Sequence, residues 1–301
     1  MEVAIRRSVQ WLPVAGRWTR ISIMGTHFDE QFRFATKTAS IEHDSDTRTT
    51  AILLIPGNPG NEGFYEHFGR ELLKNLEAEK QRCEAAKNDN YILYTVSHLN
   101  HVPLPNELHH QNSGQKESGS ILPDLLRCEY NVVCAGALFP TIERMAQSPN
   151  GERLFPIVSK LNCYDTLLTK PLVFWLDYLP FTIRKWLCSW VLPSKNVPEC
   201  IFWSAAELLR SNVFRNVVHM CTDELHKVKQ LELDATLLKY SDRIRFYYGT
   251  SDAWCPLEFG YEMRKRLGDE LVSIDDSDCK HAFVISDNEV MARKVVDWII
   301  V

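Results

Sequence analysis

The sequence predicts an α/β fold with a mostly parallel sheet and a helical insertion. Two short apolar runs, Ala51–Ile55 and Tyr91–Val96, flank residues 61–77, whose apolar side chains recur at helical spacing. Fully apolar runs of this length are typical of strands buried on both faces of a parallel sheet. Together the three segments form one βαβ unit. We therefore expect the first half of the chain to hold the start of a parallel sheet.

The remaining segments extend this pattern. Residues 1–50 predict two or three antiparallel strands, of which Trp18–Met24 is the clearest. Further along, short apolar runs and one helical period predict strands at Val132–Phe139, Arg243–Tyr248 and Glu270–Ile274 and helices at 257–267 and Asn288–Ile300. We expect residues 1–140 and 236–301 to form one core, with residues 141–235 inserted as a helical cap.

Composition excludes several classes of function. The chain has 301 residues and a net charge of −5, so it lacks the basic field of a nucleic-acid-binding protein. Its nine cysteines are scattered without a Cys-x-x-Cys pair, which predicts reduced thiols in an intracellular protein with no structural zinc site. The first 18 residues lack the apolar core of a secretory signal. No motif predicts a cofactor.

The stretch Leu172–Pro193 is rich in aromatic residues and contains three tryptophans. Asp177, Arg184 and Lys185 interrupt it and Pro180 divides it, so it does not predict a transmembrane helix. Two short halves with a basic pair fit a helical hairpin in a membrane interface, and they fit a lid over an apolar pocket equally well. The side chains expected to contact a membrane or droplet are Leu172, Phe174, Trp175, Phe181, Trp186 and Trp190.

Asp252 and His281 are the strongest candidates for catalysis. Each follows a predicted strand, at the edge of a parallel sheet where catalytic side chains gather. Their order, acid and then histidine, matches the last two members of a hydrolase triad. In such a triad the carboxylate fixes the imidazole tautomer and stabilises the imidazolium that forms. A turn aspartate and an unrelated histidine would give the same spacing.

Several longer motifs resemble the lipid droplet-associated hydrolase family, a branch of the α/β-hydrolases. They are LLIPGNPG (53–60), TVSHLNH (95–101), LFPTIERMAQSPNG (138–151), FYYGTSDAWCP (246–256) and KHAF (280–283). The resemblance implies a serine hydrolase that acts on lipid esters, cholesterol esters among them, at the cytosolic face of lipid droplets and the endoplasmic reticulum. It also implies that Asp252 is the triad acid, that His281 is the base, and that Gly57 and Asn58 line the oxyanion hole.

One departure from the family is severe, because the sequence contains no Gly-x-Ser-x-Gly. Between His98 and Leu138 lie only residues 99–137, of which 105–120 are polar and lack any period. We expect the strand that carries the nucleophile to be missing from its place between the strands at 91–96 and 132–139. Those neighbours would then either pair directly or leave unpaired edges.

Three other groups are weak substitutes for the missing serine or for a metal site. Cys134, in Val-Cys-Ala-Gly, imitates half of an elbow but lacks the first glycine, and Ser97 lacks both glycines. His98-x-x-His101 has metal-ligand spacing without a third ligand. The sequence therefore predicts a catalytically silent member of the family. The alternative is a non-catalytic protein of lipid storage that is attached to the droplet.

Overall fold

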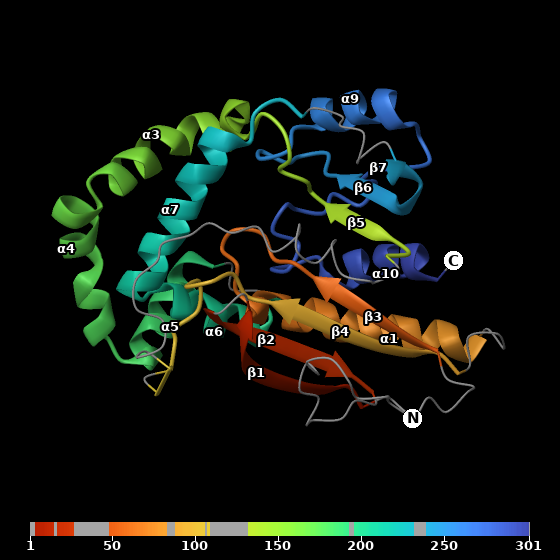
Figure 1. Cartoon of the computed structure of the whole chain (residues 1–301), viewed down its shortest axis with the longest axis horizontal. Helices are drawn as coiled ribbons and strands as arrows, with labels where there is room; N and C mark the ends of the chain where they lie inside the picture. Colours follow the sequence, from red (N-terminus) through yellow and green to blue (C-terminus); the bar gives the residue numbers. More distant parts are fainter. Residues whose placement is uncertain are drawn as a thin grey trace.

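The strands form two separate sheets in a computed structural model of the chain (Figure 1). The structure describes residues 4–14, 17–26, 48–82, 88–105, 107–108, 132–192, 196–231 and 239–300. Most of the polar stretch 105–120 lies outside these residues, as does the part of the N-terminal region at 27–47.

The first sheet has the strand order β1-β2-β4-β3. β1 (Arg6–Val14) and β2 (Arg17–Gly25) form an antiparallel hairpin, which confirms the antiparallel start of the chain. β2 pairs antiparallel with β4 (Asn90–Val96), and β4 pairs parallel with β3 (Thr49–Leu54). Because β4 lies between two strands, its apolar run is buried, as predicted.

The second sheet is entirely parallel, with the order β5-β6-β7. β5 (Ala135–Leu138) and β6 (Ile244–Tyr248) come from either side of the long helical insertion, and β7 (Val272–Ile274) follows 24 residues after β6 ends. The predicted strands at 132–139, 243–248 and 270–274 are therefore confirmed, with shorter bounds.

Two expectations about the sheet are wrong: that the run Ala51–Ile55 is buried on both faces, and that the missing strand lies between the strands at 91–96 and 132–139. β4 pairs with β2 on one side and β3 on the other, so β4 has no open side for a further strand. The run Ala51–Ile55 is not buried on both faces, because Leu53 is 42% exposed and Ile55 is 39% exposed. The reason is that β3, and not β4, is the last strand of its sheet, so among the described residues the side without a partner strand is next to β3. On the other sheet, β5 ends the order and Val133 just before it is 63% exposed. Within the described residues, neither β3 nor β5 pairs with a second strand on its outer side.

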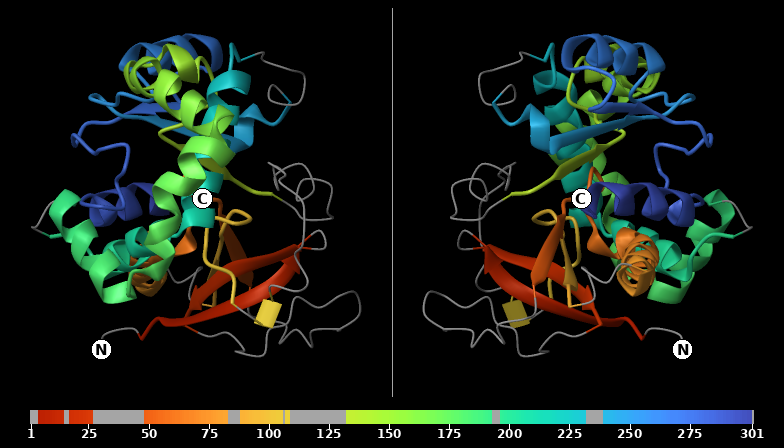
Figure 2. Two further views of the ribbon diagram at one scale, coloured as in Figure 1. Left: turned by 90° about the vertical axis from the view of Figure 1, so that its left-hand side faces the viewer. Right: turned by 90° about the vertical axis from the view of Figure 1, so that its right-hand side faces the viewer.

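Two helices join the sheets by packing against each other. α1 (Glu66–Arg82) continues a short 3-10 turn, η1 (Glu62–Tyr65), and α10 (Asn288–Ile299) closes the described chain. Their apolar faces meet in the main core, where Phe68, Leu72 and Leu76 lie with Met291 and Val296. Figure 2 shows α10 (dark blue) beneath the second sheet and α1 (orange) beside the first, on the same side of the molecule. α9 (Leu257–Leu267) covers the second sheet from the other side.

Residues 149–227 form a helical arch on one side of the molecule (Figures 1 and 2). Its helices are α3 (Pro149–Cys163), a π-helical turn (Asp165–Thr169), α4 (Lys170–Val173), a 3-10 turn (Phe174–Tyr178), α5 (Phe181–Val191), α6 (Glu199–Leu208) and α7 (Ser211–Lys227). Pro180 is the N-cap of α5, so it divides the aromatic stretch as expected. Among the described residues, no helix has the length and apolar character to cross a lipid bilayer.

Phe283 is the aromatic residue that ties the second sheet to α1. Its ring lies edge-on to Phe68 at 5.1 Å between centroids and stacks on Phe139 at 6.0 Å. Only 6% of Phe283 is exposed, so its removal would leave a cavity between the two halves of the core.

We predict that Phe283→Ala lowers the free energy of unfolding by about 3–5 kcal/mol, because it removes a buried ring at this junction. Phe174→Ala, at a position that is 50% exposed, is the matched control and should change stability by less than about 0.5 kcal/mol. Urea denaturation followed by circular dichroism measures both values. Equal stabilities for the two variants would contradict the role given to Phe283.

Candidate active site

Asp252 and His281 meet in a direct hydrogen bond. Nδ1 of His281 lies 2.7 Å from Oδ2 of Asp252. Because a carboxylate only accepts, Nδ1 carries the proton and Nε2 is left with its lone pair. The two residues are 29 positions apart in sequence, and the structure brings them together as the sequence predicted.

The turn after β6 fixes the carboxylate of Asp252. Its other oxygen, Oδ1, accepts hydrogen bonds from the backbone N–H groups of Trp254 at 2.7 Å and Cys255 at 3.1 Å. This is an Asx-type turn, in which the side chain caps the backbone two residues on. The Asp252 side chain is 1% exposed, whereas that of His281 is 34% exposed. The acid is therefore rigid and buried, and the imidazole reaches solvent.

An aromatic ring packs against the His281 imidazole. Its ring lies 5.8 Å from that of Phe139, and Phe283 follows two residues later in the core. Phe139 itself has a left-handed backbone with φ of 49°, a conformation that costs energy for a residue with a bulky side chain. The strained residue directly after β5 thus forms part of the wall of the site.

Sequence reasoning did not single out Cys255, which the structure places beside the pair. Its Sγ lies within 4.8 Å of the ligand atoms of Asp252 and His281. The thiol donates to the Phe139 carbonyl at 3.2 Å, and burial strongly raises its pKa. A buried, protonated thiol is a poor nucleophile, so Cys255 is a packing residue. Within the described residues, no hydroxyl or thiol is hydrogen-bonded to the His281 imidazole.

The loop Pro56–Gly60 follows β3, and two histidines hold its backbone. His98 donates from Nε2 to the Pro56 carbonyl at 2.8 Å, and Gly60 N–H donates to Nδ1 of His101 at 3.0 Å. Burial lowers the pKa of His98 and lowers that of His101 to about 3, so both rings are neutral at physiological pH. The His98-x-x-His101 spacing, considered above as a metal pair, positions this loop instead.

Gly57 and Asn58, the predicted oxyanion-hole residues, differ in their surroundings. Gly57 N–H is exposed and donates to the Tyr65 hydroxyl at 3.3 Å. The Tyr65 ring contacts Phe283 at 6.2 Å, which connects this loop to the His281 segment. Asn58 points its side chain at helix α7, where Nδ2 donates to the Val217 carbonyl at 3.2 Å and to Glu224 at 3.4 Å.

Ser97 does not act as a nucleophile in this structure. Its hydroxyl is buried, donates to Oε2 of Glu62 at 2.6 Å and accepts the Glu62 N–H at 3.0 Å. Glu62 is in turn paired with Arg20 at 3.0 Å, and Arg20 forms a two-pronged pair with Glu207 of α6 at 2.8 and 2.7 Å. Ser97 therefore belongs to a buried polar network that ties the first sheet to the helical arch.

Cys134 has no feature of an activated nucleophile either. It lies directly before β5, and burial raises the pKa of its thiol. A raised pKa keeps the thiol protonated and unreactive.

The predicted membrane-contact residues all lie on the helical arch. Leu172, Phe174, Trp175, Trp186 and Trp190 are exposed, and Trp190 is 71% exposed. Phe181 is only half-buried and packs on Trp203 at 4.7 Å between ring centroids. Arg184 of the predicted basic pair is turned inward, because it donates to the Ala206 carbonyl at 3.2 Å. The exposed surface of the arch therefore carries several large apolar side chains, and Arg184 of the basic pair serves packing.

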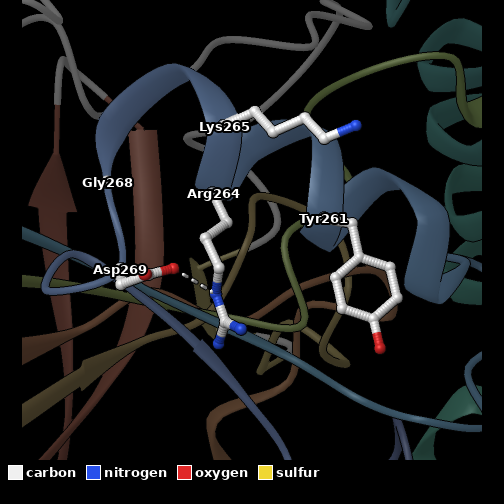
Figure 3. Close-up of a pocket in the computed structure, with 5 residues that line it drawn as sticks. All are labelled: Tyr261, Arg264, Lys265, Gly268 and Asp269. Atoms are coloured by element: carbon white, nitrogen blue, oxygen red, sulfur yellow. Dashed lines mark ion pairs between the residues drawn. The ribbon is translucent and has the colours of Figure 1, made fainter.

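One surface hollow lies apart from these residues. It is formed by the end of α9 and the turn after it, where Arg264 pairs with Asp269 at 3.3 Å and Tyr261 and Lys265 line the rim (Figure 3). Neither Asp252 nor His281 lines it.

Comparison with known proteins gives the family. A family model described as "Lipid-droplet associated hydrolase" matches residues 48–122 and 119–284. The chain belongs to the lipid droplet-associated hydrolase family. The match confirms the resemblance seen in the sequence motifs, and with the parallel strands it gives the α/β-hydrolase fold class.

Members of the lipid droplet-associated hydrolase family from several animals are similar to this chain. The Gallus gallus protein is 27% identical, with 82% of this chain and 84% of the relative covered. The Homo sapiens protein is 25% identical, with 85% and 86% covered. Among solved structures, a peroxisomal alpha-beta-hydrolase from Saccharomyces cerevisiae is similar over 98% of this chain and 87% of its own, with 10% identity and a TM-score of 0.48.

We predict that Gly60→Ala destabilises the protein by about 1–3 kcal/mol, the usual cost of overpacking. A Cβ at Gly60 would lie 1.7 Å from Cδ2 of His98, so the ring that holds Pro56 would be displaced. At Gly57 nothing lies within 4 Å of an added Cβ, and Gly57→Ala is the matched control. Thermal unfolding of both variants measures the difference, and equal melting temperatures would contradict the contact.

Proposed function

We propose that this chain is a lipid-droplet protein that keeps the acid and the imidazole of an ester hydrolase but no longer supplies the attacking group. The observation that carries this proposal is the Asp252–His281 hydrogen bond, which leaves Nε2 without a hydroxyl or thiol partner in the described part of the chain. The sequence contains no Gly-x-Ser-x-Gly from which a serine could come. We therefore propose that ester hydrolysis is silent in this form.

The complete reaction would be acyl transfer from a lipid ester, such as a cholesterol ester. A serine would attack the ester carbonyl while His281 takes its proton and returns it to the leaving alcohol. Asp252 would orient the ring, and backbone N–H groups near Gly57 and Asn58 would stabilise the oxyanion. Of these parts, the chain retains the base, the acid and the loop.

Three observations support the loss of a segment that carried the nucleophile. The family match divides at residues 119–122, inside the stretch where the serine motif is expected. The alignment with the Gallus gallus relative runs over 288 residues but covers 82% of a chain of 301, so part of the relative faces no residue here. In addition, β3 and β5 each end a sheet with exposed apolar side chains next to the vacant side.

The helical arch is the proposed contact with the droplet. It corresponds to the inserted cap at 141–235, and we propose that it binds the lipid monolayer or the cytosolic face of the endoplasmic reticulum. Its exposed apolar side chains include Leu167, Tyr178, Trp190 and Val191, the last of which is 86% exposed. Aromatic and aliphatic side chains grouped in this way fit an interface that is apolar on one side.

The alternative function is a non-catalytic protein of lipid storage whose hydrolase body serves only as a scaffold. The exposed arch supports this alternative function equally well, because droplet binding does not need the acid–imidazole pair. Neither function predicts ester hydrolysis by this chain, so the two differ in whether the Asp252–His281 pair is the remainder of a catalytic triad or only part of a scaffold.

We predict that the purified protein hydrolyses p-nitrophenyl butyrate no faster than its His281→Ala variant, because no attacker is present for the base to activate. His219→Ala, a histidine of α7 outside the site, is the matched control. A rate that falls a hundredfold or more in His281→Ala and not in His219→Ala would contradict the silent-hydrolase proposal.

We predict that replacing Trp175, Trp186 and Trp190 together by Ala lowers the droplet-bound fraction about tenfold or more, since each ring buries a large apolar surface. Flotation with triolein droplets coated with phosphatidylcholine measures that fraction. Tyr261→Ala, an exposed aromatic on α9, is the control and should float like the parent protein. Unchanged flotation of the triple variant would indicate that the arch is a lid and not a lipid contact.

A further inference from the structure

The loop Pro56–Gly60 is attached to the helical arch through the side chain of Asn58, whose carbonyl oxygen lacks a hydrogen-bond partner. Asn58 donates both hydrogens of Nδ2 to helix α7, one to the Val217 carbonyl and one to Oε2 of Glu224. Its carbonyl oxygen, Oδ1, is buried and has no hydrogen-bond partner. A buried acceptor without a partner costs about 1–3 kcal/mol, so this site is incomplete as it stands.

Glu224 can supply the hydrogen bond that Asn58 Oδ1 lacks. A carboxylate only accepts, but a protonated carboxyl also donates one hydrogen. With Glu224 protonated, one of its oxygens would accept from Nδ2 of Asn58 while its O–H donates to Oδ1. This is the two-bond pairing of a carboxylic acid with a carboxamide, and it gives the unpartnered Oδ1 a donor.

The electrostatic surroundings of Glu224 agree with this pairing. Desolvation raises its pKa from the ordinary value of 4.5 to about 7, the Asn58 hydrogen bond opposes that rise, and the charge of Asp223 adds to it. Asp223 is itself paired with Lys227 along α7. Glu224 in turn contributes to the raised pKa of the neighbouring Cys221 thiol, about 11. Helices α3, α4 and α6 pack against α7, and among the described residues Asp223 is the charged group that acts on the Glu224 carboxyl.

We propose that Glu224 and Asn58 form a proton-dependent contact that holds the loop Pro56–Gly60 against helix α7. At pH values where Glu224 is protonated, the two-bond pair fixes the loop to the arch. At higher pH, the carboxylate faces the Asn58 carbonyl oxygen, one bond is lost and the loop separates from α7 more often. Glu224 is thus a positioning residue for the candidate oxyanion loop, and it links that loop to the part of the molecule proposed to meet lipid.

The raised pKa of Glu224 determines how protection of the loop changes with pH. A group whose pKa is higher in the folded protein than in the unfolded chain stabilises the fold at low pH, and this contribution is lost as the pH rises through the folded value. The loop should therefore be best protected near pH 5.5 and least protected near pH 8. Because a tenfold change in an equilibrium corresponds to one pKa unit, we expect at least about a tenfold fall in protection between these values.

Hydrogen–deuterium exchange tests the proposal on the intact chain. Amide protection of the peptides covering 57–65 and 217–227 is measured at pH 5.5 and 8, after correction for the intrinsic exchange rate. Glu224→Gln keeps an amide that can both donate to and accept from Asn58, so it should protect both peptides equally at the two pH values. Glu224→Ala should be poorly protected at both. Asp223→Asn removes a charge that adds to the raised pKa of Glu224, so it should keep the pH dependence of the parent protein with its midpoint at a lower pH.

The outcomes distinguish the contact from a general loss of stability. Peptides of α10 serve as the internal reference and should not change between pH 5.5 and 8. Equal protection of the loop at both pH values in the parent protein, or the parental pH dependence persisting in Glu224→Gln, would overturn the proposal. Backbone exchange is measured without any substrate, so these results are independent of whether the chain hydrolyses an ester.

Discussion

The packing of α1 against α10 is the constraint on which the rest of the structure depends. In the described residues, no backbone ladder joins the two sheets, and the apolar side chains of the main core hold the loop after β3 near the loops after β5 and β6. Phe283 belongs to the same core and packs between Phe68 on α1 and Phe139 after β5. Because His281 is two residues before Phe283, the same packing that joins the sheets also sets the position of the imidazole.

Much of the fold could be predicted from the sequence because its signals are local. The apolar run of β4 and the helical periods of α1, α9 and α10 depend on spacing within one segment, and all four elements were expected. The burial of β3 could not be predicted in the same way. An apolar strand has the same composition whether or not a second neighbour covers it, so the exposure of Leu53 follows only from its place at the end of the sheet order.

The same distinction applies to the site. Asp252 and His281 were predicted because each follows a strand and because the order of the two is informative. The contacts of Asn58 with Glu224, and of Ser97 with Glu62, join residues that are 166 and 35 positions apart. The sequence likewise places Arg184 in a basic pair expected at a membrane interface. In the structure, its guanidinium instead donates to the Ala206 carbonyl. No local pattern marks such pairings, which arise only when the arch and the loop are packed together.

We propose that this member of the lipid droplet-associated hydrolase family holds a formed acid–imidazole pair, with no nucleophile among the described residues for the pair to activate. The most direct measurement is peptide mapping by mass spectrometry after incubation with a fluorophosphonate. This reagent forms a stable adduct only with a hydroxyl or thiol that a base has activated. The account predicts that no residue carries the adduct above the level found in His281→Ala. Stoichiometric labelling of one serine, threonine or cysteine that disappears in His281→Ala would contradict it.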